Sequence, residues 1–185
     1  YFCLKLKLII MKKLLLLFFT ACTFSSFSQI VNIPDPEFKQ ALLNYSPRID
    51  TNYDYQISIQ EAQAITSLTI TNHHREEHGG DPNDPFGGFP FVQEGIYDFT
   101  GIEAFINLTY LDCSDNDLIS LDVSALTQLT SLNCSSNINH MGFGGGITTL
   151  TLPNSNTLTQ INTSINYLSS LDLSNFKSVV EINVA

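Results

Sequence analysis

A short motif that recurs at a fixed spacing limits the fold of this chain more than any other feature. Four segments have apolar residues at their first and fourth positions and a small or apolar residue at the sixth, and they begin at Leu108, Leu129, Leu158 and Val179. Their starts are 21, 29 and 21 residues apart. Because repeated units of this length pack on their neighbours, the spacing predicts stacked coils that bury a continuous core.

A second row of apolar residues keeps the same spacing. It begins at Leu121, Leu150 and Leu171, which are again 29 and 21 residues apart. Both rows therefore place one insertion of eight residues between Asn137 and Leu150, and the Gly-rich stretch 140–146 fits it. Weaker copies of the first motif are predicted upstream, at Ile65–Ile70 and at Ile96–Ile102.

The combined pattern resembles that of the leucine-rich-repeat family, in which Leu-x-x-Leu-x-Leu/Cys-x-x-Asn-x-Leu recurs every 20–29 residues. The agreement covers residues 62–185 and is strongest with the short, internalin-like repeats of secreted bacterial surface proteins. The resemblance implies an α/β solenoid, a right-handed coil of short parallel strands with a small helical cap at residues 29–61. Since the chain ends at Ala185 within a predicted strand, we expect the repeats to be truncated there.

The alternation within each motif predicts which side chains face inward. Leu111, Cys113 and their equivalents point to one side of a strand, so stacking buries them. The motif asparagines are predicted to form an inward ladder that bonds the turning backbone, and they are Asn116, Asn137 and Asn166. Cys113 and Cys134 occupy equivalent inward positions. The Cα spacing of adjacent strands permits a disulfide, but parallel Cβ vectors would strain it, so we favour two buried thiols.

The segment before the repeats carries the signals of a short helix. Asp35 followed by Pro36 is typical of a helix start. An apolar stripe at helical spacing follows, at Phe38, Leu42 and Tyr45. The pair Ser46–Pro47 ends the predicted helix. We expect this segment to cover the open apolar end and the unpaired strand edge of the first coil.

The twelve residues from Asp50 to Glu61 resemble the calcium loop of the EF-hand family. The resemblance implies six Ca²⁺ ligands: the side chains of Asp50, Asn52, Asp54 and Glu61, the Gln56 carbonyl and a water on Ser58. One position departs from it, since Tyr55 stands where the family has Gly and would need a positive φ at a cost of ~1 kcal/mol or more. A second interpretation needs no ion, because Ser58 and Glu61 also match a capping box that starts a helix. The sequence leaves both open, and any calcium binding is expected to be weak.

The first 28 residues are typical of an export signal with an upstream extension. Lys12 and Lys13 precede the apolar run Leu14–Phe19, and small and polar residues follow as far as Ser28, where we expect cleavage. The apolar run is too short to span a bilayer of ~30 Å, so we expect no transmembrane span after the signal is removed. A lipoprotein signal that is acylated at Cys22 is the alternative.

The charge of the chain excludes one class of partner. Residues 29–185 carry four basic residues and all 18 acidic residues, which gives a net charge of −14. Such a surface repels phosphate backbones and anionic lipid. We therefore expect no nucleic-acid binding, whereas cation binding is compatible with this charge.

Two loop segments could carry further chemistry. His73–His78 groups three histidines with two glutamates, but Gly and Pro residues follow it and it lacks the His-Glu-x-x-His order of zinc proteases. We predict a solvated loop there, with a metal site as the alternative. The tract Phe86–Phe91 places aromatic residues beside glycines, which suits either an exposed contact patch or packing on the solenoid. The sequence contains no recognisable set of nucleophile, base and orienting residue.

These features favour a secreted or cell-surface repeat module that binds an extracellular protein or a glycan and is not itself an enzyme. The predicted outward strand positions are polar, small and mostly uncharged, which suits contact with a macromolecule and plain solvation alike. The rival hypothesis is an accessory repeat region of a longer secreted hydrolase whose catalytic domain is missing from this sequence.

Overall fold

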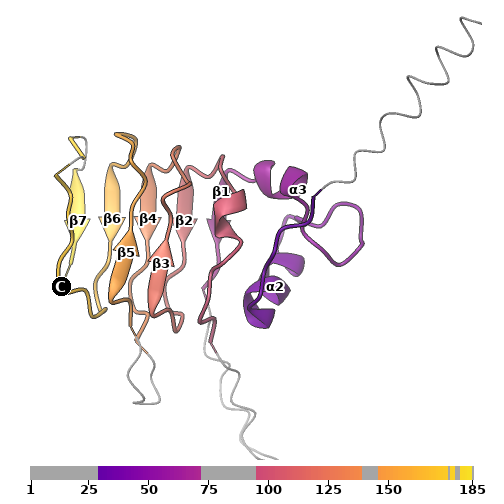
Figure 1. Cartoon of the computed structure of the whole chain (residues 1–185), viewed down its shortest axis with the longest axis horizontal. Coiled ribbons are helices and arrows are strands. Elements are labelled where there is room, and N and C mark those ends of the chain that lie inside the picture. Colours follow the sequence, from indigo (N-terminus) through magenta and orange to yellow (C-terminus); the bar gives the residue numbers. More distant parts are fainter. Residues whose placement is uncertain (1–28, 72–94, 139–145, 175, 178–179, 185) are drawn as a thin grey trace, which may run out of the picture.

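The structure is a computed structural model, and it describes residues 29–71, 95–138, 146–174, 176–177 and 180–184. The helices are α2 (Pro36–Leu43) and α3 (Ile59–Gln63), and the 3₁₀ helix η1 (Ile102–Ala104) lies between the first two strands. The strands are β1 (Ser67–Thr69), β2 (Tyr110–Asp112), β3 (Ser120–Asp122), β4 (Ser131–Asn133), β5 (Thr149–Thr151), β6 (Gln160–Asn162) and β7 (Glu181–Asn183). Figure 1 shows α2 and α3 at one end of an elongated stack of strands and β7 at the other.

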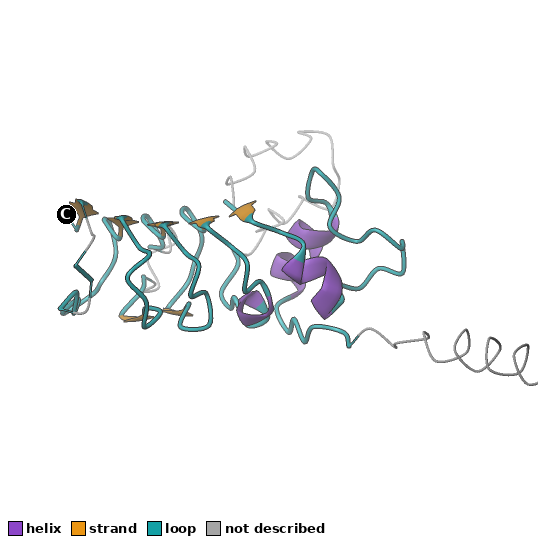
Figure 2. Ribbon diagram, turned by 90° about the horizontal axis from the view of Figure 1, so that it is seen from above, coloured by secondary structure: helices purple, strands orange, loops and turns teal. Residues whose placement is uncertain are grey.

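The strands form two parallel sheets along the solenoid. The larger sheet has the order β1-β2-β4-β6-β7, and β3 pairs with β5 in the smaller one. Figure 2 shows the larger sheet along one side of the stack and the smaller sheet along the other. The central residues of the larger sheet are in the predicted register, and they are Leu68, Leu111, Leu132, Ile161 and Ile182. The architecture is a leucine-rich-repeat solenoid, which confirms the predicted fold.

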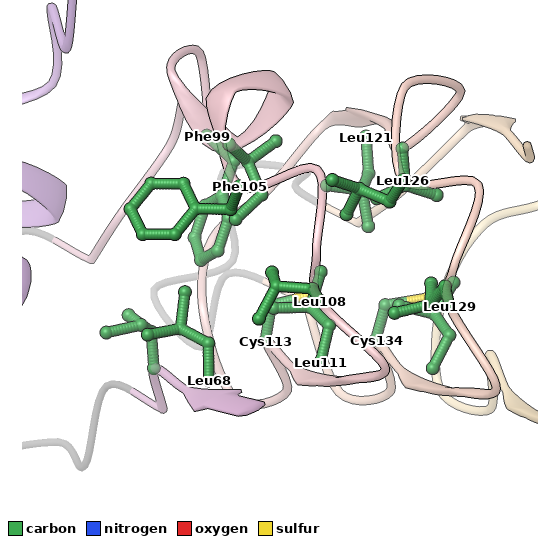
Figure 3. Packing of buried hydrophobic residues seen from close by; sticks show 14 of the residues in the cluster. Leu68, Phe99, Phe105, Leu108, Leu111, Cys113, Leu121, Leu126, Leu129 and Cys134 are labelled. Atoms are coloured by element: carbon green, nitrogen blue, oxygen red, sulfur yellow. The ribbon is translucent and has the colours of Figure 1, made fainter. Parts of the chain in front are cut away.

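The inward residues form one continuous core. Leu111 and Leu132 are at most 1% exposed, and Ile161 is 2% exposed. Figure 3 shows the side chains of one coil, including Leu111 and Cys113, beside those of the next, including Cys134. Burial of each such leucine stabilises the fold by about 1.5–3 kcal/mol, so the stacked columns are the main source of stability.

One of the predicted upstream copies is not a strand. Ile96 and Phe99 are buried, but β1 pairs directly with β2, which leaves no place for a strand between them. The segment is instead the return path of the coil that begins with β1. Its apolar residues fill the core from the opposite side, where the Phe99 ring stacks on the Phe38 ring of α2 at a centroid distance of 4.3 Å.

Helix α2 forms for the reasons that the sequence predicts. Asp35 is its N-cap, and Oδ1 of this residue accepts the N–H groups of Glu37 and Phe38, both at 2.9 Å. Phe38 and Leu42 are fully buried. Tyr45 lies beyond the end of the helix, so only two members of the predicted apolar stripe are helical.

Polar contacts join this cap to the first coil. Oδ2 of Asp35 accepts the N–H groups of Tyr97 at 3.0 Å and Asp98 at 3.1 Å. The Tyr45 hydroxyl accepts the N–H of Thr69 at 3.2 Å, on the side of β1 that faces away from β2. The cap thus covers the end of the core and pairs part of the strand edge.

The asparagine ladder is confirmed. Nδ2 of Asn137 donates to the carbonyls of Cys113 at 3.3 Å, Cys134 at 2.9 Å and Ser135 at 3.2 Å. Its Oδ1 accepts the N–H of Leu118 at 3.3 Å. The amides of Asn116 and Asn166 each donate to three carbonyls at the equivalent positions. Each ladder residue therefore ties two consecutive coils together where the backbone turns.

Cys113 and Cys134 are buried free thiols, as we expected. Burial raises the pKa of Cys113 well above its ordinary value, and the nearby Cys134 and Asp112 add to this effect. Burial and Asp112 raise the pKa of Cys134 to about 12. Both side chains are therefore protonated core residues near neutral pH rather than reactive thiolates.

Several predictions concern residues outside the described ranges. They are the export signal at 1–28, the histidine segment His73–His78, the aromatic tract Phe86–Phe91 and most of the Gly-rich insertion. Within the ranges that the structure describes, no helix combines the length and the apolar character needed to cross a membrane.

Candidate binding face and cation loop

The larger sheet turns one face away from the core. Aligned residues lie on this face, because each precedes the central residue of its strand, and four of them are Tyr110, Ser131, Gln160 and Glu181. Tyr110 is 37% exposed, and Gln160 and Glu181 are exposed as well. Nε2 of Gln160 donates to Oε2 of Glu181 at 3.0 Å. We call these four residues the outward row.

A second polar row on this face contains Asp112, Asn133 and Asn162, each directly after the central residue of its strand. Their side-chain oxygens accept hydrogen bonds from the protein itself. Oδ1 of Asp112 accepts the N–H and the hydroxyl of Ser114 at 3.0 and 2.6 Å. Asn133 and Asn162 bind the serine two residues further on in the same way. These oxygens close the turns that end the strands, a role that the sequence pattern did not reveal. The outward row is therefore the freer of the two for contact with a ligand.

Tyr110 is coupled to an acidic neighbour within this face. Its hydroxyl donates to Oδ2 of Asp112 at 3.4 Å. Burial raises the pKa of Tyr110, and the charge of Asp112 raises it further. The phenol therefore stays a neutral hydrogen-bonding group throughout the physiological pH range.

We call the twelve residues from Asp50 to Glu61 the cation loop. Its backbone is organised around the side chain of Asp50, which is only 1% exposed. Its two carboxylate oxygens accept the N–H groups of Asp54 at 3.3 Å and Tyr55 at 3.2 Å. Oδ1 of Asn52 accepts the N–H of Asp54, and Oδ1 of Asp54 accepts the N–H of Gln56, both at 2.9 Å. The loop backbone is thus wrapped around its own side-chain oxygens.

The resemblance to the EF-hand loop requires a positive φ at Tyr55, and the loop backbone has this conformation. Tyr53 and Tyr55 have φ angles of 63° and 62°, so the sixth loop position is left-handed although Tyr occupies it. Ile57, at the eighth position, is buried, and its carbonyl accepts the N–H of Val31 at 2.8 Å. The N-terminal segment therefore pairs with the end of this single loop.

Hydrogen bonds already engage the carboxylate of Glu61. Oε1 accepts the N–H and the hydroxyl of Thr51, both at 2.8 Å, and Oε2 accepts those of Ser58 at 3.0 and 2.8 Å. The Ser58 hydroxyl accepts the Glu61 N–H at 3.2 Å, which completes the capping box of α3. Burial raises the pKa of Glu61, but the bonds from Ser58 and Thr51 outweigh it and lower the pKa to about 2.

The fit of this loop to Ca²⁺ is partial. Its carboxylate, amide and carbonyl oxygens are the ligands that a hard cation prefers. Across the part of the chain that the structure describes, however, no three His, Cys, Asp or Glu side chains form a group that could hold a metal ion, so Asp50, Asp54 and Glu61 are not gathered in this way. A bidentate Glu61 would first have to give up its bonds from Thr51 or Ser58. The contact between Thr51 and Glu61 is one that the calcium-loop pattern of the sequence did not predict.

Solved structures show what this fold is similar to. The functional domain of InlJ from Listeria monocytogenes, which includes a cysteine ladder, is 27% identical over 85% of this chain with a TM-score of 0.56, and the chain spans 28% of its length. The internalin InlF from the same organism is 18% identical over 88% of this chain and 47% of its own, with a TM-score of 0.49. The CBM51-2 and INT domains of ZmpB from Clostridium perfringens are 23% identical over 57% of this chain and 17% of their own, with a TM-score of 0.39.

The likeness to InlJ agrees with an internalin-like repeat architecture. In this chain, Cys113 and Cys134 lie at equivalent positions directly after the paired strands β2 and β4. No protein-family model matches the sequence, and no curated protein matches it significantly.

Proposed function

We propose that this leucine-rich-repeat solenoid is a secreted or cell-surface module that binds an extracellular protein or a glycan and catalyses no reaction. One observation carries the proposal. The outward row presents an aromatic, a hydroxyl, an amide and a carboxylate side chain in register on a parallel sheet, beside a row whose oxygens are already engaged. Contacts with a partner therefore fall on the outward row. The internalin-like fold and the export signal expected at 1–28 support a secreted or cell-surface location.

Binding to defined extracellular surfaces tests this function. The purified chain is applied to a glycan array and to immobilised extracellular-matrix proteins, with binding measured by biolayer interferometry. We expect saturable binding to at least one surface. The double variant Tyr110→Ala/Gln160→Ala should weaken it about fivefold or more, because it removes the aromatic group and the amide at the centre of the face.

The smaller sheet supplies the matched control. Ser120 and Thr149 are exposed and paired across β3 and β5, so Ser120→Ala/Thr149→Ala also truncates two aligned surface residues. Binding should survive this change. Equal weakening by both double variants, or binding to no array member and no matrix protein, would contradict the proposal.

We also propose that the loop binds one Ca²⁺ as a weak structural ion, through Asp50, Asn52, Asp54, Gln56, Ser58 and Glu61. The oxygen-rich donor set and the left-handed backbone at Tyr55 support this assignment. The ion would supply positive charge among the loop carboxylates and so strengthen the cap. Because Glu61 must exchange hydrogen bonds for the ion, we expect a Kd of ~10⁻⁴–10⁻³ M.

Titration with Ca²⁺ by calorimetry, or with Tb³⁺ by luminescence, tests the ion site. We expect a response that Asp50→Ala abolishes and Asp122→Ala retains, since Asp122 is an exposed aspartate of β3 outside the loop. No response up to ~10 mM, or the same response from Asp50→Ala, would reject the ion. The capping box would then be the whole role of Ser58 and Glu61.

A further inference from the structure

We propose that Tyr53 and Tyr55 form a second ligand site, on the cap, that binds a neutral sugar ring by stacking. The two rings are 67% and 74% exposed, and every residue from 51 to 56 is exposed. The segment between α2 and α3 that carries them projects from the cap at the end of the solenoid opposite β7 (Figure 1). The site is therefore separate from the outward row and does not depend on it.

The choice of tyrosine at these positions is not explained by the shape of the loop. Both residues adopt a left-handed backbone, which costs a bulky side chain ~1 kcal/mol or more and which Gly or Asn adopts more easily. A buried ring could recover that cost through packing, but these rings lie mostly in solvent. Two exposed aromatic rings at strained positions only two residues apart point to a role in recognition.

The loop backbone that carries the rings is fixed by hydrogen bonds, and one of the two rings has a side-chain contact. The buried carboxylate of Asp50 accepts the Tyr55 N–H at 3.2 Å, which fixes the backbone that carries this ring. The Arg48 guanidinium lies 4.6 Å from the centroid of the Tyr53 ring, which restrains the second ring. Aromatic side chains on a fixed backbone lose less conformational entropy on binding than side chains on a loose loop.

The surrounding chemistry favours a neutral sugar over other ligands. A pyranose has a face of C–H bonds that stacks on an aromatic ring and a rim of hydroxyls that need hydrogen-bond partners. Arg48 and Gln56 are exposed beside the two tyrosines and carry N–H donors and a carbonyl acceptor for such hydroxyls. The net charge of −14 over residues 29–185 disfavours anionic ligands, whereas a neutral sugar carries no charge to be repelled.

Titration of the full chain with neutral hexasaccharides tests the site. The probes are cellohexaose, xylohexaose, mannohexaose, laminarihexaose and chitohexaose, with a proline-rich peptide as the competing class of ligand. We expect saturable binding of at least one sugar, which Tyr53→Gly/Tyr55→Gly should weaken about tenfold or more. Glycine relieves the left-handed strain, so this variant should keep or raise the midpoint temperature of unfolding.

Two matched variants complete the experiment. Tyr53→Phe/Tyr55→Phe keeps the rings and should keep most of the affinity, and Tyr167→Ala, which removes a tyrosine that is 60% exposed on another coil, should leave binding unchanged. The proposal is overturned if no hexasaccharide binds at ~10 mM, if only the peptide binds, or if the glycine variant binds sugar as well as the unmodified chain. Because the tyrosine side chains are not among the proposed Ca²⁺ ligands, the two proposals can fail separately.

Discussion

Asn137 and Asn116 occupy the same ladder position in consecutive coils, yet they do not make the same number of hydrogen bonds. Asn137 is fully buried, donates three hydrogen bonds to carbonyls and accepts one from a backbone N–H. Asn116 also donates three, but its buried Oδ1 has no hydrogen-bond partner among the described residues. Among the described residues, the two asparagines therefore differ by one hydrogen bond to the backbone.

Replacement of these asparagines should reveal that difference. We expect Asn137→Ala to lower the free energy of unfolding by about 2–4 kcal/mol, because several buried backbone groups lose their partner. Asn116→Ala should cost about 1 kcal/mol less, since its Oδ1 accepts no hydrogen bond from the residues that the structure describes. Urea denaturation of both variants measures the two losses. Equal losses would show that the fourth hydrogen bond of Asn137 contributes nothing.

Ile165 is strained by its place in the repeat. Asp115, Ser136 and Ile165 each precede a ladder asparagine and have φ angles of 54°, 55° and 56°. A β-branched residue tolerates this conformation poorly, and Ile165 is 52% exposed, so it gains little from packing. We expect Ile165→Asn to raise the free energy of unfolding by about 1 kcal/mol.

Ile119 is the control for this change, because it is 53% exposed and its φ is not positive. Thermal denaturation should show a higher midpoint for Ile165→Asn and an unchanged or lower one for Ile119→Asn. A similar shift in both variants would assign the effect to the loss of an exposed apolar side chain, not to the backbone.

At the scale of elements, one carboxylate both starts a helix and ties it to a coil. Asp35 accepts four N–H groups, two from α2 and two from residues 97 and 98. We expect Asp35→Ala to destabilise the protein by about 2–4 kcal/mol, more than the ~1 kcal/mol typical of an N-cap alone. The control is Asp122→Ala, since the Asp122 carboxylate accepts the Ser124 N–H and no other N–H of the described residues. Comparable losses in urea denaturation would show that the link to the coil adds nothing.

The Glu61 carboxylate in the first turn of α3 should make the stability of the folded protein fall at acidic pH. The pKa of Glu61 is about 2 in the folded protein and 4.5 ordinarily, so the unfolded chain takes up this proton first as the pH falls. The stabilisation is full above about pH 4.5 and is lost towards pH 2, with an upper limit of about 3 kcal/mol. Urea denaturation between pH 5 and pH 2.5 measures it. Glu61→Gln should flatten the pH dependence, and an unchanged slope would contradict the assignment.

At the scale of the whole molecule, the central strand residues differ in how far they are buried along the stack of described coils. Ile182 is 50% exposed, whereas its counterparts in β1, β2, β4 and β6 are at most 2% exposed. Each coil of a solenoid is stabilised mainly by its neighbours. The interior coils, which contain Cys113 and Cys134, should therefore be the last to open.

Thiol labelling measures this opening. We expect Cys113 and Cys134 to react slowly with a thiol reagent in the native state and rapidly in denaturant, because both are fully buried and their pKa values are raised. The labelling rate should follow the stability of the interior coils as urea is added. Fast native labelling at the rate of a free cysteine would contradict the stacked core.

Residues with a repeated environment could be predicted from the sequence. The inward columns, the ladder asparagines, the Asp35 cap and the Ser58–Glu61 capping box all depend on short-range periodicity or local hydrogen bonding, and the structure contains each of them. The apolar residues of Ile96–Phe99 match the motif, yet this segment is the return path of a coil and forms no strand. Only its position opposite β1 and β2 shows which side of the core it fills.

The sequence by itself determined the coil, its period and the direction of its side chains, because neighbouring units of a solenoid meet through residues at fixed offsets. Contacts between distant residues were decided only by the tertiary structure. The second pair of bonds to Asp35, the bond between Tyr45 and Thr69 and the capture of Glu61 by Thr51 join positions 10 to 63 residues apart. No periodic signal encodes such contacts, because each occurs once and forms only when the folded chain brings the two groups together.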